Sequence, residues 1–310
     1  MRFTGGSRSS AENKSDGRVG ALYDSRRTVN VGGRILDLSV PVVMGIINVT
    51  PDSFYAGSRT PLDGEAGKLA VRVRCAAEEG AALLDVGGYS SRPGATDVEP
   101  EEEFRRVAAA MEAIRKAMPE MPVSVDTFRA SVVRRVTEAF GAVIVNDISA
   151  GELDAEMIPT VAELGLPYIA MHMRGTPADM QRHTDYGGDV VGEVVRYFAR
   201  KVETLREAGI ADVILDPGFG FAKTVEQNFE LLGRMRDLQV LGCPVLAGIS
   251  RKTLIWKTLD VTPDAALNGT TALHWECLRQ GAAILRVHDV REAAETVRLY
   301  GKFRENVESL

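Results

Sequence analysis

The sequence predicts an α/β protein, a single (β/α)8 TIM barrel that follows an N-terminal β-hairpin. The main observation is an alternation, from residue 42 onward, between short apolar runs and longer amphipathic segments. Several runs are apolar almost throughout, as strands of a parallel sheet covered by helices should be. These candidate strands occupy residues 42–49, 82–87, 122–126, 143–147, 167–173, 213–218, 244–250 and 283–289.

The segments between the runs carry apolar residues three and four positions apart, which is the spacing of one face of a helix. Val107, Met111, Ile114 and Met118 are an example. Repeated strand and helix units over this length favour the barrel. A doubly wound sheet is the alternative, but the segment G-F-G-F-A-K (218–223) lacks the glycine spacing of a dinucleotide-binding loop.

The chain before the first strand has two parts. Residues 28–39, T-V-N-V-G-G-R-I-L-D-L-S, alternate in polarity around Gly32 and Gly33, which predicts a hairpin because both glycines adopt positive φ readily. Residues 1–27 are rich in Gly, Ser and charge and lack periodicity, which predicts a mobile tail. We therefore expect one barrel domain over residues 28–310.

The composition excludes several classes of protein. The 310 residues are 45% hydrophobic, and 37 Lys and Arg against 43 Asp and Glu give a net charge of −6, so neither a disordered chain nor a nucleic-acid-binding protein is expected. Three scattered cysteines do not make a disulfide or zinc framework. No apolar run reaches the ~20 residues of a membrane helix, and the N-terminus lacks the apolar core of a secretion signal. We expect a cytoplasmic protein without membrane contact.

Polar or charged residues lie at the end of each candidate strand. Barrel enzymes carry their chemistry at the carboxyl ends of the strands, so these residues are the first candidates for a functional site. They are Asn48, Asp85, Asp126, Asn146, Asp147, His172, Asp216, Ser250, Arg251, Lys252, Arg286 and His288.

A cationic group comes from the last two strands. Arg286 and His288 are two positions apart and so share one face of a strand, and Ser250-Arg251-Lys252 ends the strand before it. The loops after these two strands are the usual phosphate site of a barrel, and guanidinium and ammonium groups bind phosphate oxygens. The pattern predicts an anion site. A structural ion pair is the alternative for Arg286.

A second group comprises Asp126, Asn146 and Asp216, from three other strands. Carboxylate and amide groups of this kind could bind a flat heterocycle rich in N–H donors. They could equally hold a divalent metal ion, or form internal salt bridges that stabilise the barrel. Spacing alone does not choose among these three.

The loops after the first, second and sixth strands are dense in Gly, Pro and Ser, which is typical of binding loops. Three aromatic residues lie in them, Phe54, Phe219 and Phe221. Exposed aromatic rings in such loops suit stacking on a planar ligand.

Eight motifs at these strand ends resemble those of the dihydropteroate synthase family, in the same order. They are M-G-I-I-N-V-T-P-D-S-F, D-V-G-G-x-S-x-R-P-G, S-V-D-T, N-D-I, M-H-M, L-D-P-G-F-G-F-x-K, S-R-K and R-V-H-D. The resemblance extends from about Val29 to beyond Asp289. It implies a Mg²⁺-assisted condensation of (7,8-dihydropterin-6-yl)methyl diphosphate with 4-aminobenzoate, which gives 7,8-dihydropteroate and pyrophosphate in folate biosynthesis. The implied mechanism is dissociative.

The resemblance also implies a role for individual residues. Asp126, Asn146, Asp216 and Lys252 would hold the pterin. Asn48, Arg92, Arg286 and His288 would engage the pyrophosphate, and Asn48 would also help to place Mg²⁺. Ser91, Pro93, Phe221 and Thr253 would form the aminobenzoate pocket. The residues closest to the chemistry would be Asn48, Asp126, Lys252, Arg286 and His288.

Four positions differ from the family pattern. Ala56 stands where the first loop usually has a second carboxylate, Tyr89 replaces a glutamate, Ser91 replaces a threonine, and Ala222 replaces a common glycine before Lys223. The altered first loop makes a catalytically silent pterin-binding homologue an alternative. A pterin-dependent methyltransferase is a second alternative, because it shares the pterin-reading barrel. For partners, the resemblance implies small-molecule substrates, sulfonamides as inhibitors and a homodimer.

Overall fold

A computed structural model describes residues 28–49, 62–89 and 98–307 of the chain. The predicted N-terminal tail, residues 1–27, lies outside these ranges.

Eight parallel strands form one sheet in the order β8-β7-β6-β5-β4-β3-β10-β9. Leu215 of β8 forms a parallel bridge with Val245, and its N–H donates to the carbonyl of Pro244 at 2.9 Å, so the two ends of the sheet meet. This closed ring confirms the predicted barrel and excludes the open doubly wound sheet. The strands are β3 (Val42–Asn48), β4 (Leu83–Gly87), β5 (Val123–Asp126), β6 (Ile144–Asp147), β7 (Tyr168–Met171), β8 (Val213–Asp216), β9 (Leu246–Ala247) and β10 (Ile284–Val287).

Each strand falls within one of the eight apolar runs, but β9 has only two residues. Pro244 has no N–H to donate, which limits pairing at the start of this run. At its end the chain turns sharply, because the N–H of Lys252 donates to the carbonyl of Ile249 at 3.0 Å and Arg251 has a φ of 53°. The turn brings Ser250 and Lys252 to the mouth of the barrel.

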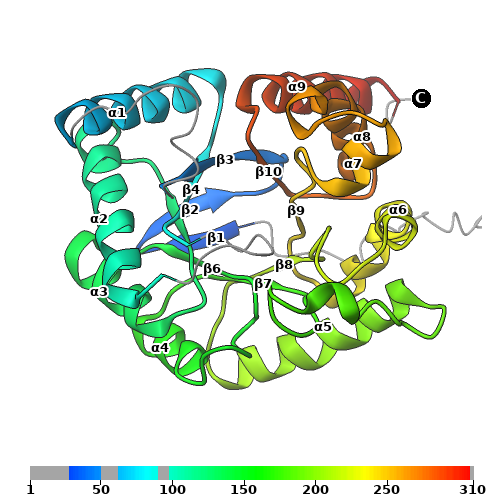
Figure 1. Ribbon diagram of the computed structural model, residues 1–310, viewed down its shortest axis with the longest axis horizontal. Helices are drawn as coiled ribbons and strands as arrows, with labels where there is room; N and C mark the ends of the chain where they lie inside the picture. Colours follow the sequence, from blue (N-terminus) through cyan, green and yellow to red (C-terminus); the bar gives the residue numbers. More distant parts are fainter. Residues whose placement is uncertain (1–27, 50–61, 90–97, 308–310) are drawn as a thin grey trace, which may run out of the picture.

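Helices surround the ring (Figure 1). In α2, Pro100 occupies the first turn together with Glu101, Glu102 and Glu103, which suits the positive end of the helix dipole. Val107, Met111 and Ile114 are buried as predicted, and Met118 lies at the helix end. The helices are α1 (Leu62–Glu79), α2 (Pro100–Ala117), α3 (Ala130–Phe140), α4 (Met157–Leu164), α5 (Val190–Glu207), α6 (Val225–Gly233), α7 (Thr253–Thr258), α8 (Leu267–Arg279) and α9 (Val290–Val307), with 3-10 segments at Met180–Arg182, Met235–Leu241 and Pro263–Ala265.

The predicted hairpin is formed by β1 (Thr28–Val31) and β2 (Arg34–Asp37), and both turn glycines have positive φ. Its buried side chains pack against the amino end of the barrel. The cluster combines Val29, Val31, Leu36 and Leu38 with one inward residue from each of seven strands, Met44, Leu83, Ile144, Ile169, Ile214, Leu246 and Ile284. The hairpin thus closes the end of the barrel opposite to the carboxyl ends of the strands.

Two residues further along four of these strands, the inward side chain changes from apolar to polar. Leu83, Ile144, Ile214 and Ile284 form what we call the apolar layer. Asp85, Asn146, Asp216 and Arg286 follow them at the strand period of two and form the charged layer. The residues between the two layers, such as Leu84, Val145, Leu215 and Leu285, face the surrounding helices in the main core.

Candidate active site

The charged layer is organised around Arg286. Its Nε donates to Oδ2 of Asp85 at 2.6 Å, and its Nη2 donates to Oδ2 of Asp126 at 2.7 Å. Asp85 is fully buried and also accepts from Nδ2 of Asn146 at 3.2 Å. The barrel therefore brings four polar residues from β4, β5, β6 and β10 into one network. The ion pair considered as the alternative for Arg286 is present.

Asp126 lies at the open edge of this network and keeps 22% of its side-chain surface exposed. Burial raises its pKa to about 7, although the charge of Arg286 opposes the shift. For Arg286 the effect of burial is opposite, because it disfavours the charged guanidinium and lowers the pKa. The charges of Asp85 and Asp126 outweigh this effect and raise the pKa of Arg286 above its ordinary value. At neutral pH the guanidinium is charged, and Asp126 is present in both its protonated and its ionised form.

Asp216 and Lys252 form a second polar pair across the mouth. Oδ1 of Asp216 accepts from the N–H of Gly218 at 2.8 Å, and burial raises the pKa of this carboxyl group. The Lys252 ammonium donates to the carbonyl of Phe219 at 2.6 Å and lies 4.8 Å from the ring centre of Phe221. Burial lowers the pKa of Lys252 to about 8, with Asp216 opposing the shift.

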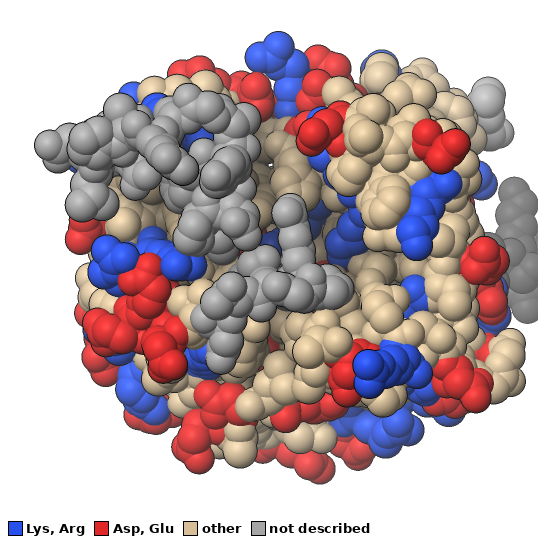
Figure 2. Space-filling view, viewed as in Figure 1, with Lys and Arg blue, Asp and Glu red and all other residues tan. Residues whose placement is uncertain are grey.

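Two glycines keep the space in front of these groups open. A Cβ atom at Gly248 would lie 3.7 Å from Oδ2 of Asp216 and 3.8 Å from Nζ of Lys252. A Cβ atom at Gly87 would lie 3.6 Å from Oδ1 of Asn48 and 3.8 Å from Oδ2 of Asp126. Asn48 and Asp126 therefore face one side of the mouth, and Asp216 and Lys252 face another. In the space-filling view, Lys and Arg side chains lie within a hollow near the centre of the molecule (Figure 2).

The remaining cations of the last two strands have different roles. His288 is exposed, and its Nδ1 lies 3.1 Å from Oγ of Ser250. Arg251 was expected to contribute to the anion site, and this prediction is wrong. Its Nε and Nη2 donate to the carboxylate of Asp289, each at 2.8 Å, and its Nη1 donates to the carbonyl of Pro263. Arg251 thus ties together the loops after β9 and β10.

The residues assigned to the aminobenzoate pocket are only partly described. Phe221 is half-buried beside Lys252, and Thr253 is the half-buried first residue of α7. Ser91, Arg92 and Pro93 lie outside the described residues, as do Phe54 and Ala56. Tyr89 is described, and its ring packs edge-on against Phe128 at 5.2 Å.

The expectation of an exposed aromatic ring at Phe219 is wrong. Phe219 is fully buried within the main core. Phe219 lies in the core and Phe221 in the same loop is half-buried, and loop composition alone does not reveal that difference.

Three further residues of the site were given no role from the sequence. Asp85 binds both Arg286 and Asn146, and Lys223 lies 3.0 Å from Nδ1 of His172 behind the mouth. A carboxylate within an otherwise apolar strand was the available signal for Asp85. The partners of Lys223 come from a loop and another strand, so spacing could not reveal them.

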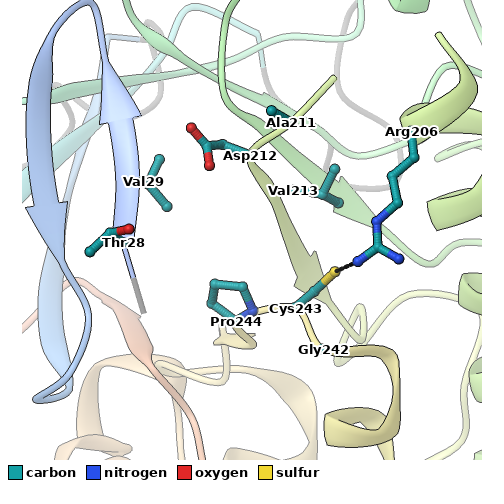
Figure 3. A pocket seen from close by; sticks show the side chains of 9 residues that line it. All are labelled: Thr28, Val29, Arg206, Ala211, Asp212, Val213, Gly242, Cys243 and Pro244. Carbon is teal, nitrogen blue, oxygen red and sulfur yellow. Dashed lines mark hydrogen bonds between the residues drawn. The ribbon is translucent and has the colours of Figure 1, made fainter. Parts of the chain in front are cut away.

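A small pocket lies at the opposite end of the barrel, beside the hairpin (Figure 3). Its volume of about 10 Å³ is at the limit for one water molecule. The residues around it belong to β1, to the end of α5, and to the segments 211–213 at the start of β8 and 242–244 before β9. Nη2 of Arg206 lies 3.8 Å from Sγ of Cys243. This pocket is too small for an organic substrate.

Within the described ranges, no cluster of three or more His, Cys, Asp or Glu side chains has the arrangement of a metal site. Among the helices of the same ranges, none is long and apolar enough to cross a membrane.

The sequence matches the family described as "Pterin binding enzyme" over residues 44–288, which includes the barrel strands except the first two residues of β3. The chain belongs to this family. It is 43% identical to the dihydropteroate synthase of Escherichia coli K12 over 86% of this chain and 93% of that protein. It is 42% identical to the dihydropteroate synthase of Synechocystis over 82% of this chain and 86% of that protein.

Solved structures agree with these relatives. The Yersinia pestis dihydropteroate synthase in a sulfonamide drug complex is 39% identical and superposes with a TM-score of 0.81, over 90% of this chain and 99% of that one. The Xanthomonas albilineans dihydropteroate synthase with 4-aminobenzoic acid gives a TM-score of 0.80 at 39% identity, over 90% of this chain and 98% of that one. The predicted family and the predicted activity, that of a transferase of folate biosynthesis, are confirmed.

Proposed function

We propose that this chain joins the methylene carbon of (7,8-dihydropterin-6-yl)methyl diphosphate to the amino nitrogen of 4-aminobenzoate, at the mouth of the barrel. The observation that carries the proposal is the network in which Arg286 binds Asp85 and Asp126, with Asp216 and Lys252 across the same mouth. It combines acceptors for a pterin with cations for a leaving anion. The Xanthomonas albilineans structure contains 4-aminobenzoic acid, and the family resemblance implies the pterin diphosphate as the other substrate.

The pterin would bind to Asp126, Asn146, Asp216 and Lys252. A pterin presents an amino-pyrimidine edge rich in N–H donors, and the two carboxylates are acceptors of matching chemistry. Asn146 is held by Asp85 and Lys252 by the carbonyl of Phe219, so both side chains are oriented before a ligand arrives. Preorganised polar groups of this kind stabilise charge without rearrangement.

The pyrophosphate would bind to Arg286, His288 and Asn48, with Arg92 as the further cation implied by the family resemblance. Nε and Nη2 of Arg286 bind the carboxylates, so Nη1 is the nitrogen that would contact an incoming anion. His288 is exposed on the same strand, two residues further on. A charged guanidinium beside a developing phosphate anion lowers the barrier to its departure.

The residues present fit a bound Mg²⁺ ion. Mg²⁺ takes oxygen ligands, and it is often bound by one or two protein oxygens together with water and substrate phosphates. Oδ1 of Asn48 faces the same space as Asp126 and is the oxygen that would hold the ion. When bound, Mg²⁺ would supply positive charge to the pyrophosphate oxygens.

The reaction would be dissociative. Electron donation from the reduced pterin ring breaks the bond between the methylene carbon and the pyrophosphate oxygen, which leaves a cation that the carboxylates of Asp126 and Asp216 stabilise. The amine of 4-aminobenzoate then forms the new carbon–nitrogen bond and loses a proton. Phe221 and Thr253 would line the aminobenzoate pocket, together with Ser91 and Pro93. We also propose a cytoplasmic homodimer that sulfonamides inhibit as mimics of aminobenzoate.

Purified protein should be incubated with Mg²⁺ and the pterin pyrophosphate, with and without 4-aminobenzoate. We expect pyrophosphate release that requires the arylamine and matches the dihydropteroate formed, mole for mole. Lys252→Met should abolish most of this release, whereas Lys257→Met, a change later in α7, should not. Pterin binding without product would contradict the proposal and indicate a silent homologue. Methyl transfer would indicate the alternative enzyme.

A further inference from the structure

The loop between β8 and α6 forms a platform beside the site, which we define as residues 218–222. Every carbonyl oxygen of this platform accepts a hydrogen bond from a side chain outside it. The donors are Lys223 for both Gly218 and Phe221, Lys252 for Phe219, Gln181 for Gly220 and Tyr186 for Ala222. A loop held in this way has few alternative conformations.

Lys223 makes two of these contacts from a fully enclosed position. Its side chain is buried, and Nζ lies 3.0 Å from the carbonyls of Gly218 and Phe221 and 3.0 Å from Nδ1 of His172. Burial lowers the pKa of Lys223 to about 7, with the charge of Asp216 opposing the shift. In its ammonium form the group has three N–H donors, and the three acceptors match them one to one. The burial of a lysine without such partners would be strongly unfavourable.

His172 supplies the third acceptor from the end of β7. The ring is buried, and burial lowers its pKa well below the ordinary value, so it is neutral. When Lys223 carries its proton, Nδ1 accepts from it and the ring proton is on Nε2. The platform also packs tightly against this residue, since a Cβ atom at Gly218 would lie 2.0 Å from the carbonyl oxygen of His172.

The platform connects Lys223 to the site on its other side. The N–H of Gly218 donates to Asp216, the carbonyl of Phe219 accepts from Lys252, and the ring of Phe221 lies under the same ammonium. Lys223 therefore contacts the inner side of the platform. The outer side of the platform orients Asp216 and Lys252, two of the groups proposed to bind the pterin. Lys223 is 3% exposed, so it has almost no surface for direct contact with a substrate.

We propose that Lys223 is a positioning residue, which fixes the platform through the carbonyls of Gly218 and Phe221 and so holds Lys252 and Phe221 in the geometry that binds substrate. His172 completes this arrangement as the third acceptor. The proposal rests on the proposed function for the identity of the ligand, but the platform itself can be examined without turnover.

The test compares Lys223→Met, which keeps the length of the side chain and removes its donors, with Lys302→Met, a change at an exposed lysine of α9. Two quantities are measured, the dissociation constant of the pterin pyrophosphate and amide hydrogen exchange along the chain. Lys223→Met should weaken binding roughly tenfold, and faster exchange should be confined to residues 217–224. Lys302→Met should change neither quantity.

His172→Leu is the second variant, in case Lys223→Met does not fold. It removes one acceptor and leaves both carbonyl contacts, so binding should weaken about threefold, with the same local change in exchange. The double variant should lose less binding free energy than the two single variants lose together, because both changes affect the same contact.

Unchanged binding and exchange in the variant that folds would overturn the proposal. Faster exchange throughout the barrel would also overturn it, since that result indicates a general structural role. If wild-type protein binds the pterin but forms no dihydropteroate, the proposed reaction fails and these measurements still decide the role of Lys223. If wild-type protein does not bind the pterin, the exchange measurement alone decides it.

Discussion

The apolar layer and the charged layer lie two residues apart on the same four strands and contribute different properties. Leu83, Ile144, Ile214 and Ile284 pack with the hairpin at the amino end of the barrel. Asp85, Asn146, Asp216 and Arg286 face the open carboxyl end, and three of them are joined in one hydrogen-bonded network. Position along a strand therefore separates stability from chemistry in this protein. Variants of adjacent inward residues can test that separation.

Arg286→Met should have the largest effect of the variants considered. It leaves the fully buried carboxylate of Asp85 without its cation, which should lower the free energy of unfolding by about 3–5 kcal/mol. It should also reduce turnover roughly 10³-fold, because the proposed pyrophosphate contact is lost. Urea unfolding and steady-state kinetics measure the two effects. Arg291→Met, at an exposed arginine of α9, is the control, and an equal loss there would contradict the account.

Ile284→Ala changes the apolar layer on the same strand as Arg286. The side chain is fully buried, so the free energy of unfolding should fall by about 3 kcal/mol through lost burial and a cavity. The KM values of both substrates should stay within about twofold in the folded protein, because the hairpin end is remote from the site. A large change in KM, measured where the variant is folded, would show that the two layers are coupled. Leu299→Ala, at an exposed position, should leave stability within about 0.5 kcal/mol.

Asp126→Asn should change the pH dependence of pterin binding. The raised pKa of about 7 means that Asp126 loses its proton between about pH 6 and 8, and the ionised form is the better acceptor. Affinity of the wild-type protein should therefore rise about tenfold from pH 6 to pH 8. The variant should bind more weakly and show a flatter profile in titrations over this range. An equal slope in both proteins would assign the titration to another group.

His274→Leu should have the smallest effect, and it concerns a buried polar side chain that lies in neither layer. Both ring nitrogens of His274 lack hydrogen-bond partners among the described residues, and burial lowers its pKa to about 4. Between pH 6.5 and 4 the unfolded chain binds a proton that the folded chain does not, so the wild-type protein loses stability as the pH falls. At pH 5.5 the loss should be roughly 1 kcal/mol relative to pH 8.

His274→Leu should lack this part of the decline in the free energy of unfolding, as measured by urea unfolding at pH 5.5 and pH 8. Identical declines in the two proteins would show that His274 gains its proton within the fold.

The strands and the hairpin could be predicted from the sequence because their signals are local. Buried parallel strands are apolar runs, and Gly32-Gly33 specifies its own turn. Side-chain contacts between strands are harder to predict from the sequence. The sequence placed Asp126 and Arg286 at strand ends, but that they form an ion pair depends on the closure of the ring.

Loop side chains were harder still to predict. Phe219 and Phe221 share one loop and differ in burial, and Arg251 turns away from its neighbour Lys252 because of its positive φ. The burial and the direction of these side chains depend on tertiary contacts that residue spacing does not encode.

The most direct measurement compares two variants of β8, Ile214→Ala and Asp216→Asn, for stability and for binding of the pterin pyrophosphate. The account predicts that Ile214→Ala unfolds at lower urea and binds normally when folded. It predicts that Asp216→Asn, which keeps the size of the side chain, loses less stability than Ile214→Ala and binds at least about tenfold more weakly. Weaker binding by Ile214→Ala together with normal binding by Asp216→Asn would contradict the division of the barrel into a stabilising layer and a functional layer.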